Sequence, residues 1–112
     1  MKLLVDADAC PNVIKEILFR AAVRKKIHTL FVANTWLNLP KSAYIKMKKV
    51  KSGFDVADDE IIAQAEPGDL VITADIPLAY LAVKKGCLAL NPRGKIYTED
   101  TIQDALASRD LM

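Results

Sequence analysis

Short, uninterrupted aliphatic runs are the feature that most limits what this chain can fold into. They occupy residues 3–5, 29–33, 70–74 and 87–90, and a more mixed run lies within 44–50. Runs of three to five apolar residues are typical of strands that are covered on both faces, which is the environment of a parallel sheet with helices packed on each side.

Stretches with helical periodicity separate these runs. Apolar residues recur at helical spacing over residues 11–26, 55–65 and 77–86, and a last helix is expected from Thr98 to Leu106. Parallel strands need crossover connections, which helices usually supply. The 112 residues, 52% of them hydrophobic, suffice for one domain. We therefore expect a single α/β domain, a three-layer sandwich with a mainly parallel sheet of four to five strands.

An Asp or Asn follows each of the four continuous runs. Asp6 and Asp8 come after the first, Asn34 after the second, Asp75 after the third and Asn91 after the last. Ligands of open parallel sheets bind at the carboxyl ends of the strands. Local hydrogen bonding in turns and helix caps is the competing explanation, and for Asn34 and Asn91 it is the more common one.

The pair Asp6 and Asp8 is harder to explain by local structure. If the strand runs through Asp8, both carboxylates point to the same face, and at about 4 Å they repel by roughly 4 kcal/mol at an effective dielectric of 20. Asp58 belongs to the inward face of the helix for which Asp55 is the expected N-cap. These residues and Asp75 predict one site that binds a metal ion and carries out catalysis. Its four acids are Asp6, Asp8, Asp58 and Asp75.

The ligands available at this predicted site are all carboxylate oxygens, and the type of ligand determines which metal ion binds. A set of carboxylates suits Mg²⁺ or Mn²⁺. The two cysteines, Cys10 and Cys87, offer neither a disulfide framework nor zinc-site spacing. A metal ion held by aspartates lowers the pKa of a bound water and neutralises a phosphoryl group, which is the chemistry of hydrolytic nucleases.

Basic residues suggest how a nucleic acid would be held. The lysine-rich stretch 41–51 includes Tyr44, follows Trp36, and could track a phosphodiester backbone and stack a base. A lysine-protected edge strand explains the stretch equally well. The candidate substrate-binding residues are Asn34, Asn91, Arg93, Lys46 and Lys48. Single-stranded RNA is the expected partner, although a net charge of +2 does not by itself indicate one.

Nothing in the sequence predicts a membrane protein. No apolar run reaches the roughly 18 residues of a membrane span, and the chain enters a strand at once rather than a signal sequence. A soluble, cytoplasmic protein is the expectation.

Several motifs resemble those of one bacterial family. They are Val-Asp-Ala-Asp-Ala-Cys-Pro at 5–11, Gly-Phe-Asp-Val-Ala-Asp at 53–58, Asp-Leu-Val-Ile-Thr-Ala-Asp-Ile-Pro-Leu-Ala at 69–79 and Ala-Leu-Asn-Pro-Arg-Gly at 89–94. Together they resemble the YaiI/YqxD family of uncharacterised bacterial proteins, which is similar in turn to PIN-like domains. That resemblance implies a metal-dependent ribonuclease site with Asp6, Asp8, Asp58 and Asp75 at the metal positions. It also implies a basic carboxyl-terminal tail that this sequence lacks.

Two other functions stay open at this point. A haloacid-dehalogenase-like phosphatase also begins with a strand followed by Asp-x-Asp, and would use Asp6 as covalent nucleophile and Asp8 as acid and base. Cys10 departs from the Thr usual in that family. The third possibility is a PIN-like module that binds RNA or a protein without catalysis.

Overall fold

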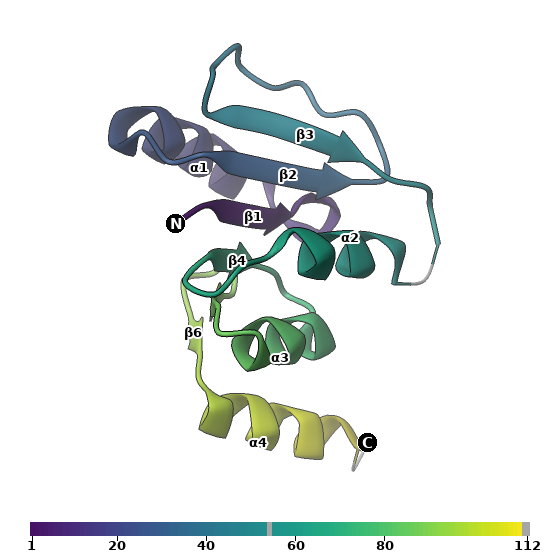
Figure 1. The fold of residues 1–112 in the computed structure, drawn as a ribbon. Coiled ribbons are helices and arrows are strands. Elements are labelled where there is room, and N and C mark those ends of the chain that lie inside the picture. The colour runs from purple at the N-terminus through teal and green to yellow at the C-terminus, as the bar shows by residue number, and fades with distance from the viewer. Residues whose placement is uncertain (54, 111–112) are drawn as a thin grey trace.

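A six-stranded sheet forms the centre of the molecule (Figure 1). The computed structural model describes the backbone of residues 1–53 and 55–110, and side chains as far as residue 106. The strand order is β3-β2-β1-β4-β5-β6, with the first five strands parallel and β6 antiparallel to β5. The strands are β1 (Leu3–Asp6), β2 (Thr29–Ala33), β3 (Ile45–Lys49), β4 (Leu70–Ile72), β5 (Leu88–Leu90) and β6 (Ile96–Tyr97).

Helices connect most of the parallel strands, as the apolar periodicity predicts, whereas residues 34–44 join β2 to β3 without a helix. The helices are the short 3-10 turn η1 (Ala7–Ala9), then α1 (Asn12–Lys25), α2 (Val56–Gln64), α3 (Ile76–Lys84) and α4 (Glu99–Asp110). The hydroxyl oxygen of Thr98 accepts a hydrogen bond from the Thr101 N–H at 3.2 Å, so Thr98 caps α4 as expected. That helix runs further than the predicted end at Leu106. None of the described helices is both long and apolar enough to cross a bilayer.

Two apolar layers hold the helices on opposite faces of the sheet. On one face, Ala22 of α1 packs with Val5 and Phe31. On the other, Ile61 of α2 belongs to the same buried cluster as the side chains of α3 and α4 and as Leu4 of β1. Alternate residues of β1 thus point into different layers, as the pleat of a strand requires. The predicted three-layer α/β sandwich with a mainly parallel sheet is confirmed.

Three local details differ from the sequence-based predictions. The first strand ends at Asp6, and Asp8 lies on η1 instead of continuing the strand. Asp55 is the N-cap residue of α2, but its backbone is left-handed with φ 64° and its side chain makes no capping hydrogen bond. The sixth strand was not predicted, because the two residues of β6 are too few to carry a periodic signal.

The neighbouring central strands β1 and β4 determine where a site can form. Their register pairs Leu3 with Leu70 and Val5 with Ile72. The chain leaves β1 toward β2 on one side, and later returns to place β4 on the other. This reversal is the switch point at which parallel α/β sheets bind ligands, and it places the residues after β4 beside Asp6.

A buried aspartate that the motif analysis does not single out ties the start of β1 to this arrangement. Asp69 is only 5% exposed. It accepts hydrogen bonds from the Lys2 N–H at 3.0 Å, from Lys2 Nζ at 2.6 Å and from the Glu66 N–H at 2.9 Å. These bonds hold the pKa of Asp69 below its ordinary value although burial alone raises it. Asp69 is therefore a structural residue at the opposite end of the strands from the candidate site.

Candidate functional site

Asp6 is the innermost acid of the site. It is the last residue of β1, is 8% exposed, and accepts a 2.8 Å hydrogen bond at Oδ2 from the hydroxyl of Thr73. Burial raises the pKa of Asp6, the bond from Thr73 opposes that rise, and the negative charges of Asp75 and Asp8 add to it. A carboxylate whose neighbours disfavour its charge is the kind of group that a bound cation stabilises.

Thr73 joins two of the predicted acids. Its side chain is fully buried, and its hydroxyl both donates to Asp6 and accepts the N–H of Asp75 at 3.0 Å. Thr73 therefore orients one oxygen of Asp6 and fixes the backbone where α3 begins. Sequence reasoning missed it by treating residues 70–74 as one apolar run. The available signal was a hydroxyl side chain within that run.

Asp75 caps α3. Its Oδ1 accepts the Leu78 N–H at 2.9 Å, and Ile76 and Pro77 follow as the first helical residues. The capping explanation for this acid is therefore correct as far as Oδ1 is concerned. Among the described residues, only Leu78 donates a hydrogen bond to the carboxylate. One oxygen of Asp75 is thus occupied by the helix, and the other is available for a ligand.

Asp8 approaches the site from the opposite side of β1. It lies exposed on η1, and its Oδ2 accepts the N–H of Asn34 at 2.8 Å. The interaction ties η1 to the loop that follows β2. Asn34, a predicted substrate-binding residue, thus contacts Asp8 through its backbone N–H.

Asp58 reaches the same acids from α2. It is the third residue of that helix, is half-buried, and has a pKa raised to about 6. Burial is the main cause, followed by the negative charges of Asp75 and Asp6. The next residue, Asp59, is exposed. The helix thus directs Asp58 inward and Asp59 outward, as its apolar stripe predicts.

The donors fit a hard divalent cation in kind and charge. Carboxylate oxygens are the preferred ligands of Mg²⁺ and Mn²⁺. The thiols of Cys10 and Cys87 are buried, and burial raises the pKa of each, so neither is a thiolate ligand. As the side chains lie, no group of three or more His, Cys, Asp or Glu within the described residues is close enough to hold a metal ion. The carboxylates influence one another through their charges without forming a closed ligand set.

A hollow of about 290 Å³ lies among residues of which two, Ala9 and Ala74, adjoin Asp8 and Asp75 in the sequence. It is lined by Ala9, Pro11, Ala74, Asn91, Pro92 and Arg93. Asn91 builds its rim: the side-chain oxygen accepts the Arg93 N–H at 2.8 Å, and Nδ2 donates to the Tyr97 hydroxyl at 2.9 Å. Both ends of the Asn91 amide are therefore used by the turn, and the neighbouring Arg93 is exposed.

The two predicted lysines of β3 lie at different levels of the sheet. Lys48 pairs with Val32, which itself lies opposite Asp6 in β1, so Lys48 is level with the acids two strands away. Its Nζ is 4.0 Å from a carboxylate oxygen of Glu60. Lys46 lines a different hollow together with His28 at the amino ends of the strands. The structure thus brings only Lys48 toward the site.

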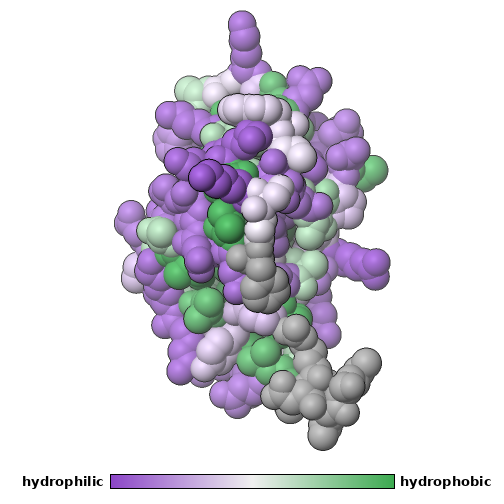
Figure 2. All heavy atoms as spheres, turned by 90° about the vertical axis from the view of Figure 1, so that its right-hand side faces the viewer, coloured by the Kyte–Doolittle hydropathy of each residue, from purple (hydrophilic) through white to green (hydrophobic). Residues whose placement is uncertain are grey.

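The surface at the carboxyl ends of the strands is largely hydrophilic. Figure 2 looks onto the side of the molecule toward which β2 and β3 point, and hydrophobic side chains there form small, separate spots. A polar rim of this kind suits a charged ligand better than an apolar one.

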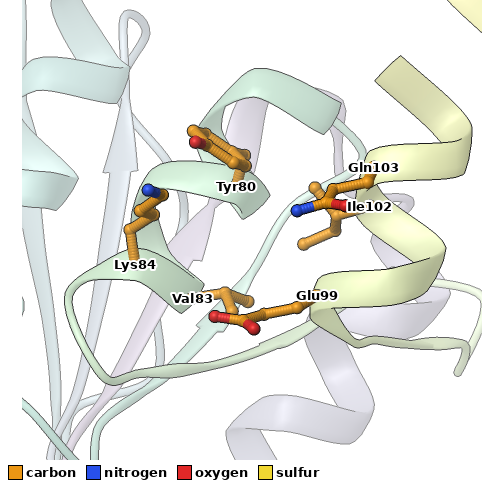
Figure 3. A pocket seen from close by; sticks show the side chains of 6 residues that line it. All are labelled: Tyr80, Val83, Lys84, Glu99, Ile102 and Gln103. Atoms are coloured by element: carbon orange, nitrogen blue, oxygen red, sulfur yellow. The ribbon is translucent and has the colours of Figure 1, made fainter. Parts of the chain in front are cut away.

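A further hollow, of about 200 Å³, lies between α3 and α4 (Figure 3). It is lined by Tyr80, Val83, Lys84, Glu99, Ile102 and Gln103. Lys84 Nζ lies 5.4 Å from the ring centre of Tyr80. Its one acid, Glu99, is exposed. This hollow has a single acid in its lining, whereas several aspartates lie at the carboxyl ends of the strands.

Fold and site together define a class: a doubly wound, mainly parallel α/β protein with aspartates at the carboxyl ends of two neighbouring central strands, where the strand order reverses. The family model described as "Uncharacterized BCR, YaiI/YqxD family" matches residues 4–112. The chain therefore belongs to the YaiI/YqxD family, as its motifs indicated. No solved structure shows significant similarity to it.

Close relatives come from several bacteria. A UPF0178 protein of Shewanella pealeana is 61% identical over 112 residues, which is all of this chain and 74% of the relative. A UPF0178 protein of Photobacterium profundum is 60% identical over the whole chain and 75% of its own length. The UPF0178 protein YaiI of Escherichia coli is 59% identical over the whole chain and 74% of its length.

Proposed function

We propose that this protein is a Mg²⁺- or Mn²⁺-dependent nuclease that hydrolyses phosphodiester bonds in RNA. The observation that carries the proposal is that carboxylates from separate segments lie near enough to affect one another's charge. Asp6 ends β1, Asp58 belongs to α2 and Asp75 begins α3, yet burial and their mutual charges raise the pKa of Asp58 to about 6. Acidic groups that are held close enough to repel one another and so have shifted pKa values are typical of a functional site.

Each acid has a distinct role in this proposal. Asp6, held by the Thr73 hydroxyl, provides an oriented inner ligand. Asp58 and the Asp75 oxygen that is not bonded to Leu78 would be further ligands on the buried side of the ion. The exposed Asp8 would be a ligand on its solvent side. A bound ion supplies a water of lowered pKa and neutralises charge on the phosphoryl group. The strand order, with β1 beside β4, also agrees with the resemblance to PIN-like ribonucleases.

The phosphatase alternative is the less favoured one. A covalent nucleophile must reach a phosphorus atom in line, but Asp6 is 8% exposed and one of its oxygens is engaged by Thr73. The non-catalytic alternative would use the same carboxylates for stability alone. It predicts tight, metal-independent RNA binding with no cleavage.

Metal binding and cleavage are tested together. Mn²⁺ affinity is measured by water proton relaxation, and cleavage is measured with an end-labelled single-stranded RNA in Mn²⁺ and in EDTA. We expect metal-dependent cleavage that Asp8→Asn and Asp58→Asn abolish. Asp59→Asn is the control, because it removes the same charge from the adjacent, exposed position. Weak Mn²⁺ binding that is unchanged in Asp58→Asn, with intact RNA throughout, would contradict the proposal.

A further inference from the structure

An exposed tryptophan lies on the loop that follows β2. Trp36 is 76% exposed, although a ring of this size is normally buried or in contact with a partner. The chain contains no other tryptophan. Tyr44, the other aromatic candidate of the region, is half-buried with its ring 5.2 Å from that of His28. The structure therefore separates the two aromatic residues that the sequence grouped together.

Hydrogen bonds on both sides of Trp36 fix its loop next to the carboxylates. Two residues earlier, the Asn34 N–H donates to Asp8 Oδ2 at 2.8 Å. One residue later, the Leu37 N–H donates to the Met47 sulfur at 3.4 Å. The exposed ring thus belongs to an anchored segment, two residues after the one whose backbone N–H binds the candidate metal ligand Asp8.

A lysine already lies against the exposed ring. Lys49 ends β3, opposite Ala33 of β2, and its Nζ is 5.8 Å from the centre of the Trp36 ring. The next backbone N–H, that of Val50, donates to the Ala33 carbonyl at 2.9 Å, which continues the strand pairing to this point. Lys48 and Lys51 are exposed nearby in the sequence. An aromatic face with ammonium groups around it is how proteins hold a stacked base and its phosphate.

We propose that Trp36 and Lys49 form a stacking platform for one base of a single-stranded polynucleotide whose backbone leads to the carboxylates. The inference rests on the proposed function for what happens at those carboxylates, and it names the form of the substrate. A base is free to stack on an exposed ring only when it is not enclosed in a duplex. Stacking does not distinguish ribose from deoxyribose, so this platform accepts both sugars.

The fluorescence of the protein reports on the platform directly, since Trp36 is its single tryptophan. Oligo(U) and oligo(dT) 12-mers are titrated into the protein in EDTA, which removes metal-dependent cleavage from the measurement. We expect saturable quenching with both, weakened by added salt. An abasic 12-mer offers the same backbone without bases, and should bind weakly and leave the emission unchanged.

Variants are compared by the anisotropy of a labelled 12-mer, which does not depend on tryptophan emission. Trp36→Ala should bind about 5- to 150-fold more weakly, as expected for the loss of one stacked base, and Trp36→Phe should recover part of the loss. Lys49→Ala should also weaken binding. Lys46→Ala is the control, because it removes an exposed lysine of the same strand near its amino end.

Unchanged emission on saturation, or wild-type affinity in Trp36→Ala, would overturn the platform. Equal quenching by the abasic oligomer would also overturn it, because that result shows a backbone contact. The proposed function fails separately. If the oligomers quench the fluorescence of wild type and of Asp58→Asn, the platform is supported. If the same wild-type protein never cleaves RNA with Mn²⁺, the nuclease proposal fails while the platform stands.

Discussion

The hydroxyl of Thr73 donates a 2.8 Å hydrogen bond to Oδ2 of Asp6 and so links two residues that are 67 positions apart in the sequence. The same hydroxyl accepts the N–H of Asp75. One buried side chain therefore sets the position of an acid at the end of β1 and of an acid at the start of α3. Its removal should disturb both.

Thr73→Val keeps the shape of the side chain and removes the hydroxyl. It leaves the Asp6 carboxylate without its donor and the Asp75 N–H without its acceptor, which should lower the free energy of unfolding by about 1–3 kcal/mol at pH 7. The pKa of Asp6 should rise, because the bond from Thr73 now lowers it. Urea unfolding and a ¹³C carboxyl titration measure these two effects. Thr73→Ser keeps the hydroxyl and should stay near wild type in both.

Capping and ligand roles of Asp75 can be separated by two substitutions. Asparagine is also a good N-cap, so Asp75→Asn should preserve the bond from the Leu78 N–H and leave stability nearly unchanged, whereas Asp75→Ala should lose about 1 kcal/mol. Both variants should lose Mn²⁺ affinity, because both remove the carboxylate. Thermal unfolding with Mn²⁺ titration distinguishes these effects. Full Mn²⁺ affinity in Asp75→Asn would assign this residue to capping alone.

The raised pKa of Asp58 predicts how stability changes with pH. Between the ordinary pKa of 3.8 and the folded value of about 6, the folded chain binds a proton at Asp58 that the unfolded chain releases. Protonation of Asp58 therefore adds to the free energy of unfolding at low pH, and this contribution is lost as pH rises through about 6. Asp58→Asn should unfold at a higher temperature than wild type at pH 7.5 and lose that advantage at pH 4. In Asp59→Asn no such crossover is expected.

Metal affinity should follow the same protonation. A carboxyl group must lose its proton before it binds a cation, so Mn²⁺ affinity should fall by about tenfold per pH unit below pH 6, where Asp58 is protonated. Relaxation titrations between about pH 5 and about pH 8, which extend roughly one unit below and two units above the expected transition, measure this dependence. An affinity that stays constant across pH 6 would show that Asp58 is not a ligand.

Local patterns were sufficient for most of the fold. Continuous apolar runs located the parallel strands because both faces of those strands are covered, and prolines and glycines located the helix ends. The inward position of Asp58 also followed from local spacing, because the next helical residue, Asp59, falls on the exposed side. These features depend on residues within a few positions of one another.

Features that depend on distant neighbours could not be predicted in the same way. The role of Thr73 exists only because β4 lies beside β1, and the bonds from Lys2 give Asp69 its structural role for the same reason. The different positions of Lys46 and Lys48 depend on the register of β3 against β2. Sequence identified the residue types of the site, while strand pairing decided which of them meet.

The pairing of β1 with β4 has a consequence for how this chain reaches its native state. Strands β1, β2 and β3 can associate as soon as the first half of the chain has been synthesised, but β1 then has an unpaired edge until Leu70–Ile72 arrives. Such an edge of an aliphatic strand readily pairs with other chains. The same late step brings Thr73 and Asp75 to Asp6. We therefore expect protection against aggregation and formation of the acid cluster to appear together during refolding.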